Sequence, residues 1–221
     1  MKELSLEDVC AEISGGSRVL LMVRHAERPH IDHDDPTFGE ELPITAAGAE
    51  ASELFGRALA GLAPDVQFLA SPLRRTRMTA EFIARGMGIP DAPIPVDPLL
   101  GNSSFYFSDQ HEVFELFRDG SFFEKIFSYF ANGTLGGFNE IGQASDKLEE
   151  WCLERFTARL GIFTTHDLYI GAYLHARKVK TDFTVSTWLR FLDSAAILLR
   201  PDGTRDYALV RAGLSDRCTG V

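Results

Sequence analysis

Cysteine is scarce in this sequence, and long hydrophobic runs are absent. The 221 residues include only three cysteines, Cys10, Cys152 and Cys218. Their wide spacing fits neither a disulfide framework nor a metal motif, and an odd number favours a reducing compartment. The first residues lack the apolar core of a signal peptide, and no run reaches the length of a membrane-spanning helix. The sequence therefore predicts a cytoplasmic protein that does not enter a membrane.

Positive charge is also in short supply. Lysine and arginine number 22 against 32 aspartates and glutamates, which gives a net charge of −10. A surface of this average charge repels phosphate-rich polymers, so nucleic acid is excluded as a bulk ligand. Several arginines nevertheless come from two short segments, 24–28 and 74–77. A local cationic site in an acidic protein suits a small phosphorylated substrate or a phosphoprotein.

The first of these segments places a histidine between arginines. Arg24-His25-Ala26-Glu27-Arg28 directly follows the apolar run 19–23, which is typical of a buried strand. Arginine carries a planar fork of donors that matches phosphate oxygens. Histidine is a base near neutral pH and can also attack phosphorus. The segment therefore predicts a nucleophile inside an anion-binding site.

The second segment, 71–81, follows another apolar run, 66–70. We expect Ser71 to be the N-cap of a helix with Pro72 at its first position. Arg75 then lies in the first turn, where free backbone donors and the helix dipole favour an anion. Arg74 and Arg77 point to other sides of such a helix, and we expect solvent around them.

The third segment ends a strand-like run with His166 and Asp167. We expect β-α alternation: strands at 18–24, 66–70, 93–97 and 161–165, a hairpin at 194–200 and 205–211, and helices at 5–14, 45–62, 72–87, 140–159 and 168–177. The face of helix 45–62 is expected to carry Ala47, Ala51, Leu54, Ala58 and Leu62. Both histidines then lie at the carboxyl ends of strands, where open α/β sheets bind ligands.

These motifs resemble those of the histidine phosphatase superfamily, which includes phosphoglycerate mutases and histidine acid phosphatases. The matching positions are Arg24-His25-Ala26, the segment 42–48, the helix positions Ser71, Leu73, Arg75, Thr76, Thr79 and Ala80, and the late His166. The resemblance covers roughly residues 18 to 175, in the order that the family has them. It implies a phosphoglycerate mutase-like, three-layer α/β sandwich with a central, mostly parallel sheet, helices on both faces and a small helical insertion.

The resemblance also implies a mechanism and its residues. His25 attacks a phosphomonoester and forms a phosphohistidine that water hydrolyses. Arg24, Arg75 and His166 hold the phosphate oxygens, and Arg28 lies where the acid phosphatases have a further phosphate-binding arginine, although Pro29 follows one residue too early. Because arginines and a histidine supply the positive field, neither a metal nor another cofactor is expected.

The sequence offers two candidates for the general acid, Asp167 and Glu27. Mutase-like members have a glutamate where this chain offers Gly101 or Asn102, whereas acid phosphatases use an aspartate that matches Asp167. We predict Asp167 as the acid, with Glu27 second, and expect burial or a nearby anion to raise the pKa of the acid. The alternative is that Asp167 only caps the helix after it.

Two segments permit a structural and a functional interpretation. The loop 30–35 holds two histidines and three aspartates, which indicates either a metal site or, as we favour, a rim that selects substrates. The stretch 101–138 holds nine phenylalanines. It is either an insertion packed against the body or an apolar lid over the site.

We expect one domain over residues 1–221, with 101–138 as lid or insertion. The predicted activity is a metal-independent phosphomonoester hydrolase. The alternatives are a mutase that moves phosphate within a sugar acid and a phosphate-binding module that has lost catalysis. The sequence does not determine the oligomeric state, although a phenylalanine-rich surface is compatible with a homodimer.

Overall fold

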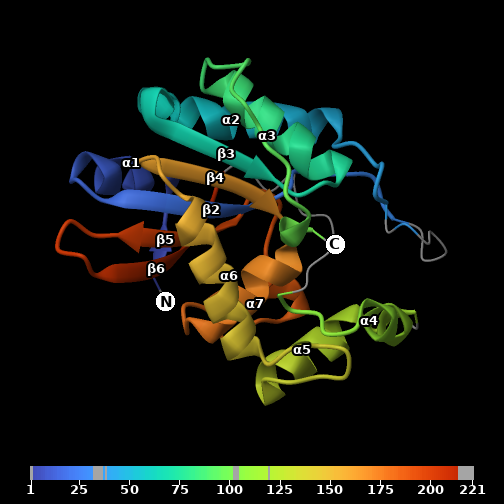
Figure 1. Cartoon of the computed structure of the whole chain (residues 1–221). Helices are drawn as coiled ribbons and strands as arrows, with labels where there is room; N and C mark the ends of the chain where they lie inside the picture. Colours follow the sequence, from blue (N-terminus) through green and yellow to red (C-terminus); the bar gives the residue numbers. More distant parts are fainter. Residues whose placement is uncertain (1, 32–36, 38, 102–104, 119, 214–221) are drawn as a thin grey trace.

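A mixed sheet of six strands forms the centre of the molecule, seen here in a computed structural model that describes residues 2–31, 37, 39–101, 105–118 and 120–213. The strands are β1 (Glu3–Leu4), β2 (Arg18–Arg24), β3 (Val66–Ala70), β4 (Leu160–Thr165), β5 (Ser194–Leu199) and β6 (Arg205–Val210), in the spatial order β1-β6-β5-β2-β4-β3. Strand β5 pairs antiparallel with β2 and β6, and the other pairs are parallel. The sheet is thus mostly parallel, as predicted (Figure 1).

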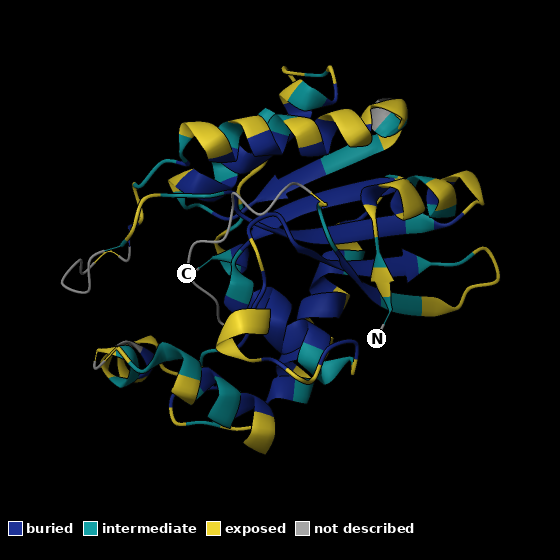
Figure 2. Ribbon diagram, turned by 180° about the vertical axis from the view of Figure 1, so that it is seen from behind, coloured by how far each residue is buried: buried dark blue, intermediate teal, exposed yellow. Residues whose placement is uncertain are grey.

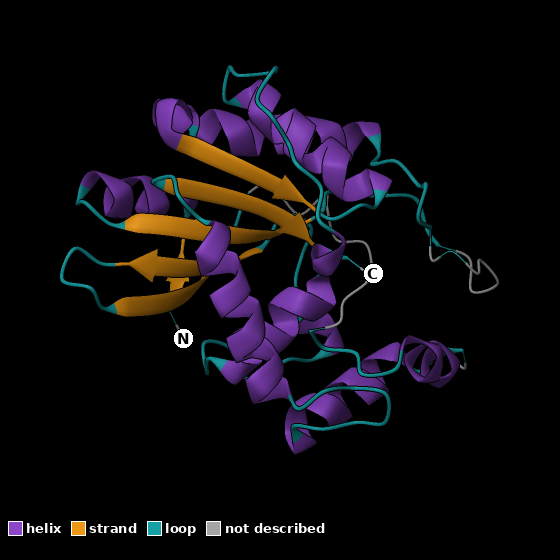
Figure 3. Cartoon of the chain, viewed as in Figure 1, coloured by secondary structure: helices purple, strands orange, loops and turns teal. Residues whose placement is uncertain are grey.

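Helices cover both faces of this sheet (Figure 3). Helices α1 (Leu6–Ser14), α2 (Ala46–Ala58) and α3 (Arg74–Gly86) share one hydrophobic core, and α5 (Phe122–Asn132), α6 (Ile141–Arg155) and α7 (Asp167–Ala176) share the other. Helix α4 (Gln110–Phe117) lies next to α5, and short 3-10 turns occupy Ala60–Asp65, Pro98–Leu100 and Val185–Thr187. The predicted three-layer sandwich is confirmed.

The central strands supply alternate side chains to the two cores. On β2, Val19, Leu21 and Val23 belong to the core beneath α1–α3, whereas Leu20 and Met22 belong to the core beneath α5–α7. Successive side chains of a strand point to opposite faces, so a strand with helices on both sides must be apolar throughout. The strands are accordingly among the most buried parts of the chain (Figure 2).

Two expectations about elements are wrong. The segment 93–97 forms no strand and contributes one isolated bridge, between Ala70 and Val96. Pro93 and Pro95 lack the N–H groups that a ladder needs. On α2, Leu54 is 42% exposed, and the helix instead buries Ala51 and Phe55.

The phenylalanine-rich stretch packs against the body through its aromatic side chains. Phe105, Phe130 and Phe138 lie in the core that α6 and α7 share. Residues 102–104 and 119 fall outside the described part of the chain, as do residues 32–36 of the loop for which a metal site was considered. Within the described residues, no helix is both long and apolar enough to span a bilayer; a cytoplasmic location stays a prediction.

Candidate active site

Three neighbouring strands bring the predicted site residues together at their carboxyl ends. His25 follows β2, Ser71 follows β3 and His166 follows β4. The backbone N–H of His25 donates to the carbonyl of Thr165, and that of Ser71 donates to the carbonyl of Thr164, each at 3.0 Å. The ring centroids of His25 and His166 lie 5.5 Å apart. Two histidines that are remote in the sequence therefore face the same small space.

The His25 ring is oriented by its own backbone. Its Nδ1 lies 2.8 Å from the carbonyl oxygen of Ala26. Since a carbonyl only accepts, Nδ1 carries the proton, and Nε2 of the neutral ring has a free lone pair. Burial and the positive charges of Arg75 and Arg24, with His166 also contributing, hold the pKa of His25 well below its usual value. The ring is thus neutral at neutral pH.

His166 is held by the end of β3. Its Nε2 lies 3.0 Å from Oγ of Ser71, which is 2.7 Å from Oγ1 of Thr76. The Thr76 hydroxyl donates to the carbonyls of Leu73 and Ser71 at 2.7 and 2.9 Å, so it is an acceptor for the Ser71 hydroxyl. Ser71 is then left to accept from Nε2–H of His166.

This arrangement corrects the predicted cap of α3. The N-cap is Leu73, without a side-chain hydrogen bond, and the helix begins at Arg74. The Ser71 side chain is already used by Thr76 and His166 and cannot reach the first turn. Burial, followed by the charge of Arg75, lowers the pKa of His166 to about 3.

Three guanidinium groups surround the histidines. Arg24 is 5% exposed, donates to the Leu189 carbonyl and lies with its guanidinium carbon 4.4 Å from the ring centre of Phe191. Arg75 donates to the Gly39 carbonyl at 2.7 Å. Burial and the charge of Arg28 lower the pKa of Arg75 to about 10. The three cations are therefore close enough to repel one another, and a bound anion relieves that repulsion.

Two of these arginines have a buried N–H group that makes no hydrogen bond to the described residues. Within the described residues, the Nε atoms of Arg24 and Arg28 are buried and lack a hydrogen-bond partner. Nη1 of Arg28 donates to the Pro29 carbonyl at 2.8 Å. An unsatisfied buried donor is costly, so these two N–H groups are suited to bind the oxygens of an anion.

Asp167 begins α7 directly after His166. Its Oδ2 lies 3.0 Å from Nη2 of Arg24 and accepts from the indole Nε1 of Trp188 at 3.1 Å. Its Oδ1 accepts from the backbone of Leu168 at 2.9 Å. Burial acts to raise the pKa of Asp167, but Arg24 and the Trp188 hydrogen bond outweigh it and the pKa is lowered. The expectation of a raised pKa is wrong, because the guanidinium of Arg24 and not an anion faces the carboxylate.

Glu27 points to a structural partner. Its Oε2 accepts from the Thr45 hydroxyl at 2.7 Å, and its carbonyl accepts from the Thr45 backbone at 2.8 Å. Thr45 is the N-cap of α2, as predicted. The carboxylate therefore ties the loop after β2 to the start of α2.

Sequence reasoning missed two aromatic residues of the site. The Phe191 ring lies 5.7 Å from the His25 ring, and the Trp188 indole contacts Asp167. Both residues come from the segment between α7 and β5, which has no periodicity. The sequence offered one indication of their role: two large aromatic residues stand in a loop just before a strand.

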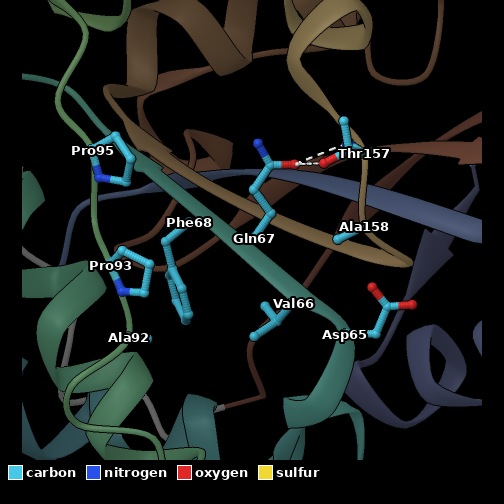
Figure 4. Close-up of a pocket in the computed structure, with 9 residues that line it drawn as sticks. All are labelled: Asp65, Val66, Gln67, Phe68, Ala92, Pro93, Pro95, Thr157 and Ala158. Atoms are coloured by element: carbon cyan, nitrogen blue, oxygen red, sulfur yellow. Dashed lines mark hydrogen bonds between the residues drawn. The ribbon is translucent and has the colours of Figure 1, made fainter.

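A groove at the opposite end of the sheet is separate from this site (Figure 4). It lies where β3 and β4 begin, between Pro93 and Thr157. Gln67 in its wall accepts from the Thr157 backbone at 2.9 Å and donates to the Arg155 carbonyl at 2.8 Å. Gln67 thus holds the chain's own backbone, which is a structural role.

Fold and site together define a class: an α/β sandwich that gathers histidines and arginines at the carboxyl ends of its central strands. Residues 20–110 match the family model of the histidine phosphatase superfamily, branch 1. The predicted resemblance to this superfamily is confirmed. No curated protein matches the chain.

Solved structures agree on the fold. A phosphoserine phosphatase mutant from Entamoeba histolytica has a TM-score of 0.55 at 15% identity, over 86% of this chain and 94% of that one. The mycobacterial glucosyl-3-phosphoglycerate phosphatase has a TM-score of 0.54 at 14% identity, over 90% and 99%. A phosphoglycerate mutase from Bacillus anthracis has 0.50 at 16%, over 88% and 93%. The chain is thus similar in fold to phosphatases and to a mutase.

Proposed function

We propose that this protein hydrolyses phosphomonoesters without a metal, through a phosphohistidine on His25. The observation that carries the proposal is the hydrogen bond from Nδ1 of His25 to its neighbour's carbonyl, with His166 5.5 Å away. This hydrogen bond leaves Nε2 of His25 unprotonated, in a site that arginine side chains surround. A hydrolase of this kind needs positioning and charge neutralisation more than further covalent chemistry.

In the first step, Nε2 of His25 attacks phosphorus and the bond to the leaving oxygen breaks. Arg24, Arg28 and Arg75 hold the phosphoryl oxygens. The phosphate dianion also favours protonation of His166, whose Nδ1–H then donates to a phosphoryl oxygen while Nε2–H keeps its bond to Ser71. The leaving alkoxide takes the proton of the Asp167 carboxyl. In the second step, water attacks the phosphohistidine, the carboxylate of Asp167 accepts a proton of the water, and the bond between nitrogen and phosphorus breaks. Orthophosphate leaves, and His25 is neutral again.

Binding of the substrate raises the pKa of Asp167, which Arg24 otherwise holds low. Arg24 pairs with Asp167 at 3.0 Å and holds its pKa low. A phosphate dianion competes for the same guanidinium and adds negative charge near the carboxylate. Both effects favour the protonated acid. Asp167 therefore remains our choice over Glu27, whose carboxylate is engaged by Thr45.

The mutase alternative is disfavoured because Gly101, which stands where that branch has its glutamate, has no room for a side chain. At Gly101, an added Cβ lies 3.0 Å from atoms of both Ser71 and Pro72. A side chain at this position therefore displaces the segment that holds His166. Small phosphorylated molecules are the proposed substrates, and phosphoserine and phosphoglycerate esters are the first to test because the similar structures carry those names.

We further propose that residues 1–221 act as one domain and that 101–138 covers the site in part. The test of the function is turnover of an aryl phosphate in the presence of a chelator. We expect release of orthophosphate by the parent chain and at least about a 1,000-fold loss in His25→Ala. Transfer of phosphate to a second hydroxyl without release supports a mutase. Binding of orthophosphate without turnover of any ester supports a binding module.

A further inference from the structure

The indole of Trp188 joins the aromatic insertion to the proposed acid. Trp188 is 6% exposed, and its Nε1 donates to Oδ2 of Asp167 at 3.1 Å. The same oxygen lies 3.0 Å from Nη2 of Arg24. One donor is an arginine of the cationic cluster, and the other is an indole packed among phenylalanine rings. The carboxylate oxygen is therefore held by two donors of different kinds.

Five phenylalanine rings fix the position of the indole. The centroid of the Trp188 ring lies 5.2 Å from that of Phe183. Four further rings come from α5: Phe123 at 5.6 Å, Phe127 at 6.0 Å, Phe130 at 6.1 Å and Phe122 at 6.2 Å. Edge-to-face and stacked contacts at these distances are favourable for aromatic side chains. The phenylalanines of α5 thus act on the site through Trp188.

A glycine on α7 lets the indole approach the helix. Gly171 lies one turn after Asp167 and therefore on the same face of α7. A Cβ at this position lies 3.0 Å from Cη2 of Trp188 and 3.4 Å from Cζ of Phe130. Any larger residue here displaces the indole from its place beside Asp167.

The charged groups around Asp167 come from three directions. Arg24 reaches it from β2, and the charges of Arg28, in the loop after β2, and of Arg75, on α3, also act on it. His166 precedes it in the chain and contributes in the same direction. Against these cations, the Trp188 N–H is a neutral donor that favours the ionised carboxyl and fixes its direction.

We propose that Trp188 is a positioning residue for Asp167, and that its indole N–H, held by the rings of α5, keeps the carboxyl group turned toward the arginines and the leaving oxygen. This inference rests on the proposed function of Asp167 as the acid. It also gives the phenylalanine-rich stretch a role in the reaction beyond packing.

The test compares two equal substitutions, Trp188→Phe and Trp151→Phe. Trp151 is also buried, at 8% exposed, and packs with Phe105 in the same core. Within the described residues its Nε1 has no hydrogen-bond partner. Both variants lose the same atoms from the core, but only Trp188→Phe removes a hydrogen bond to Asp167.

We expect Trp188→Phe to change the pH profile as well as the rate. Loss of a donor to the ionised form raises the pKa of Asp167, so the alkaline limb of kcat/KM for an alkyl phosphate moves up by about one pH unit. On the acidic plateau, kcat falls about tenfold for the alkyl ester and less than about threefold for a nitrophenyl ester, which needs no acid. Trp151→Phe should show neither effect.

A second variant covers the case in which Trp188→Phe does not fold. Gly171→Ala keeps the indole but displaces it, and should shift the same limb upward with the same preference between esters. The inference is overturned if Asp167→Asn distinguishes the two esters while Trp188→Phe and Gly171→Ala behave like Trp151→Phe. If Asp167→Asn itself treats both esters alike, the acid lies elsewhere, and the proposed role of Asp167 fails together with the inference.

Discussion

A single backbone carbonyl decides which ring nitrogen of His25 carries the proton. Ala26 follows His25 directly, and its carbonyl oxygen accepts a hydrogen bond from Nδ1–H at 2.8 Å. The opposite tautomer would put two lone pairs against each other. The sequence predicts that His25 is in the site, but not which nitrogen is free. That depends on a side-chain torsion set by packing against Phe191 and His166.

The histidines should stay neutral well below neutral pH. Burial is the largest cause of the lowered pKa in both His25 and His166, and it gives about 3 for His166. A depressed pKa means that the neutral ring persists as the pH falls through about 6.5, the ordinary value. Imidazole signals in a nuclear magnetic resonance titration from pH 8 to 5 should therefore not move for these two residues. In urea both should titrate near 6.5, and titration near that value in the folded protein contradicts the account.

Two carboxylates close to His25 should have separable roles in the proposed reaction. Asp167→Asn should lower kcat for alkyl phosphates about 100-fold and for a nitrophenyl ester only a few-fold, because a poor leaving group needs the proton. Glu27→Gln should change both esters equally and by less than about threefold, since Glu27 binds the N-cap of α2. Steady-state kinetics of both variants on the alkyl and the nitrophenyl ester measure these effects. A selective loss in Glu27→Gln instead makes Glu27 the acid.

At the scale of elements, two glycines set how closely α2 and α3 approach. A Cβ at Gly56 lies 2.1 Å from the Ile83 carbonyl oxygen, and one at Gly86 lies 2.1 Å from the Glu53 carbonyl oxygen. The glycine of each helix therefore lies directly against the backbone of the other helix, where no side chain would fit. Since α3 carries Arg75, this contact also places the arginine.

Gly56→Ala should therefore destabilise the fold despite the better helix propensity of alanine. We expect a loss of about 1–3 kcal/mol in the free energy of unfolding, because the backbone atoms must move apart. Gly61→Ala is the control, with nothing within 4 Å of the added Cβ, and should change stability by less than about 0.5 kcal/mol. Urea unfolding measures both. Equal effects contradict the close contact.

The longer elements could be predicted from the sequence because their patterns are local. The apolar run of β2 and the spacing of Ile141, Leu148 and Cys152 on α6 are visible without any tertiary contact. The start of α3 depended on a distant partner, His166, which takes the Ser71 side chain. The edge strand β1 has two residues and no pattern of its own; it exists because β6 pairs with it.

At the scale of the whole molecule, a chain of net charge −10 concentrates cations at one place. Both histidines and three arginines could be predicted for this place, because each follows or adjoins a recognisable strand or helix start. Trp188 and Phe191 could not, since a non-periodic loop brings them to the site through packing alone. The positive charges of Arg24, Arg28 and Arg75 repel one another, and this repulsion destabilises the folded protein.

Orthophosphate should consequently stabilise the folded protein. A ligand at about 100 times its Kd adds about 2.7 kcal/mol to the free energy of unfolding. The shift in Tm should disappear in Arg75→Ala and persist in Arg57→Ala, whose side chain is 54% exposed on α2. Chloride at equal ionic strength is the control for screening. An equal shift in both variants places the anion elsewhere.

Formation of a covalent bond to His25 is the central claim, and rapid quenching with a phosphorus-labelled ester tests it most directly. The account predicts label on the peptide that contains His25, stable to alkali and released by acid, and none in His25→Ala. Release of orthophosphate by the parent chain with no trapped label, or with label on another residue, would contradict it.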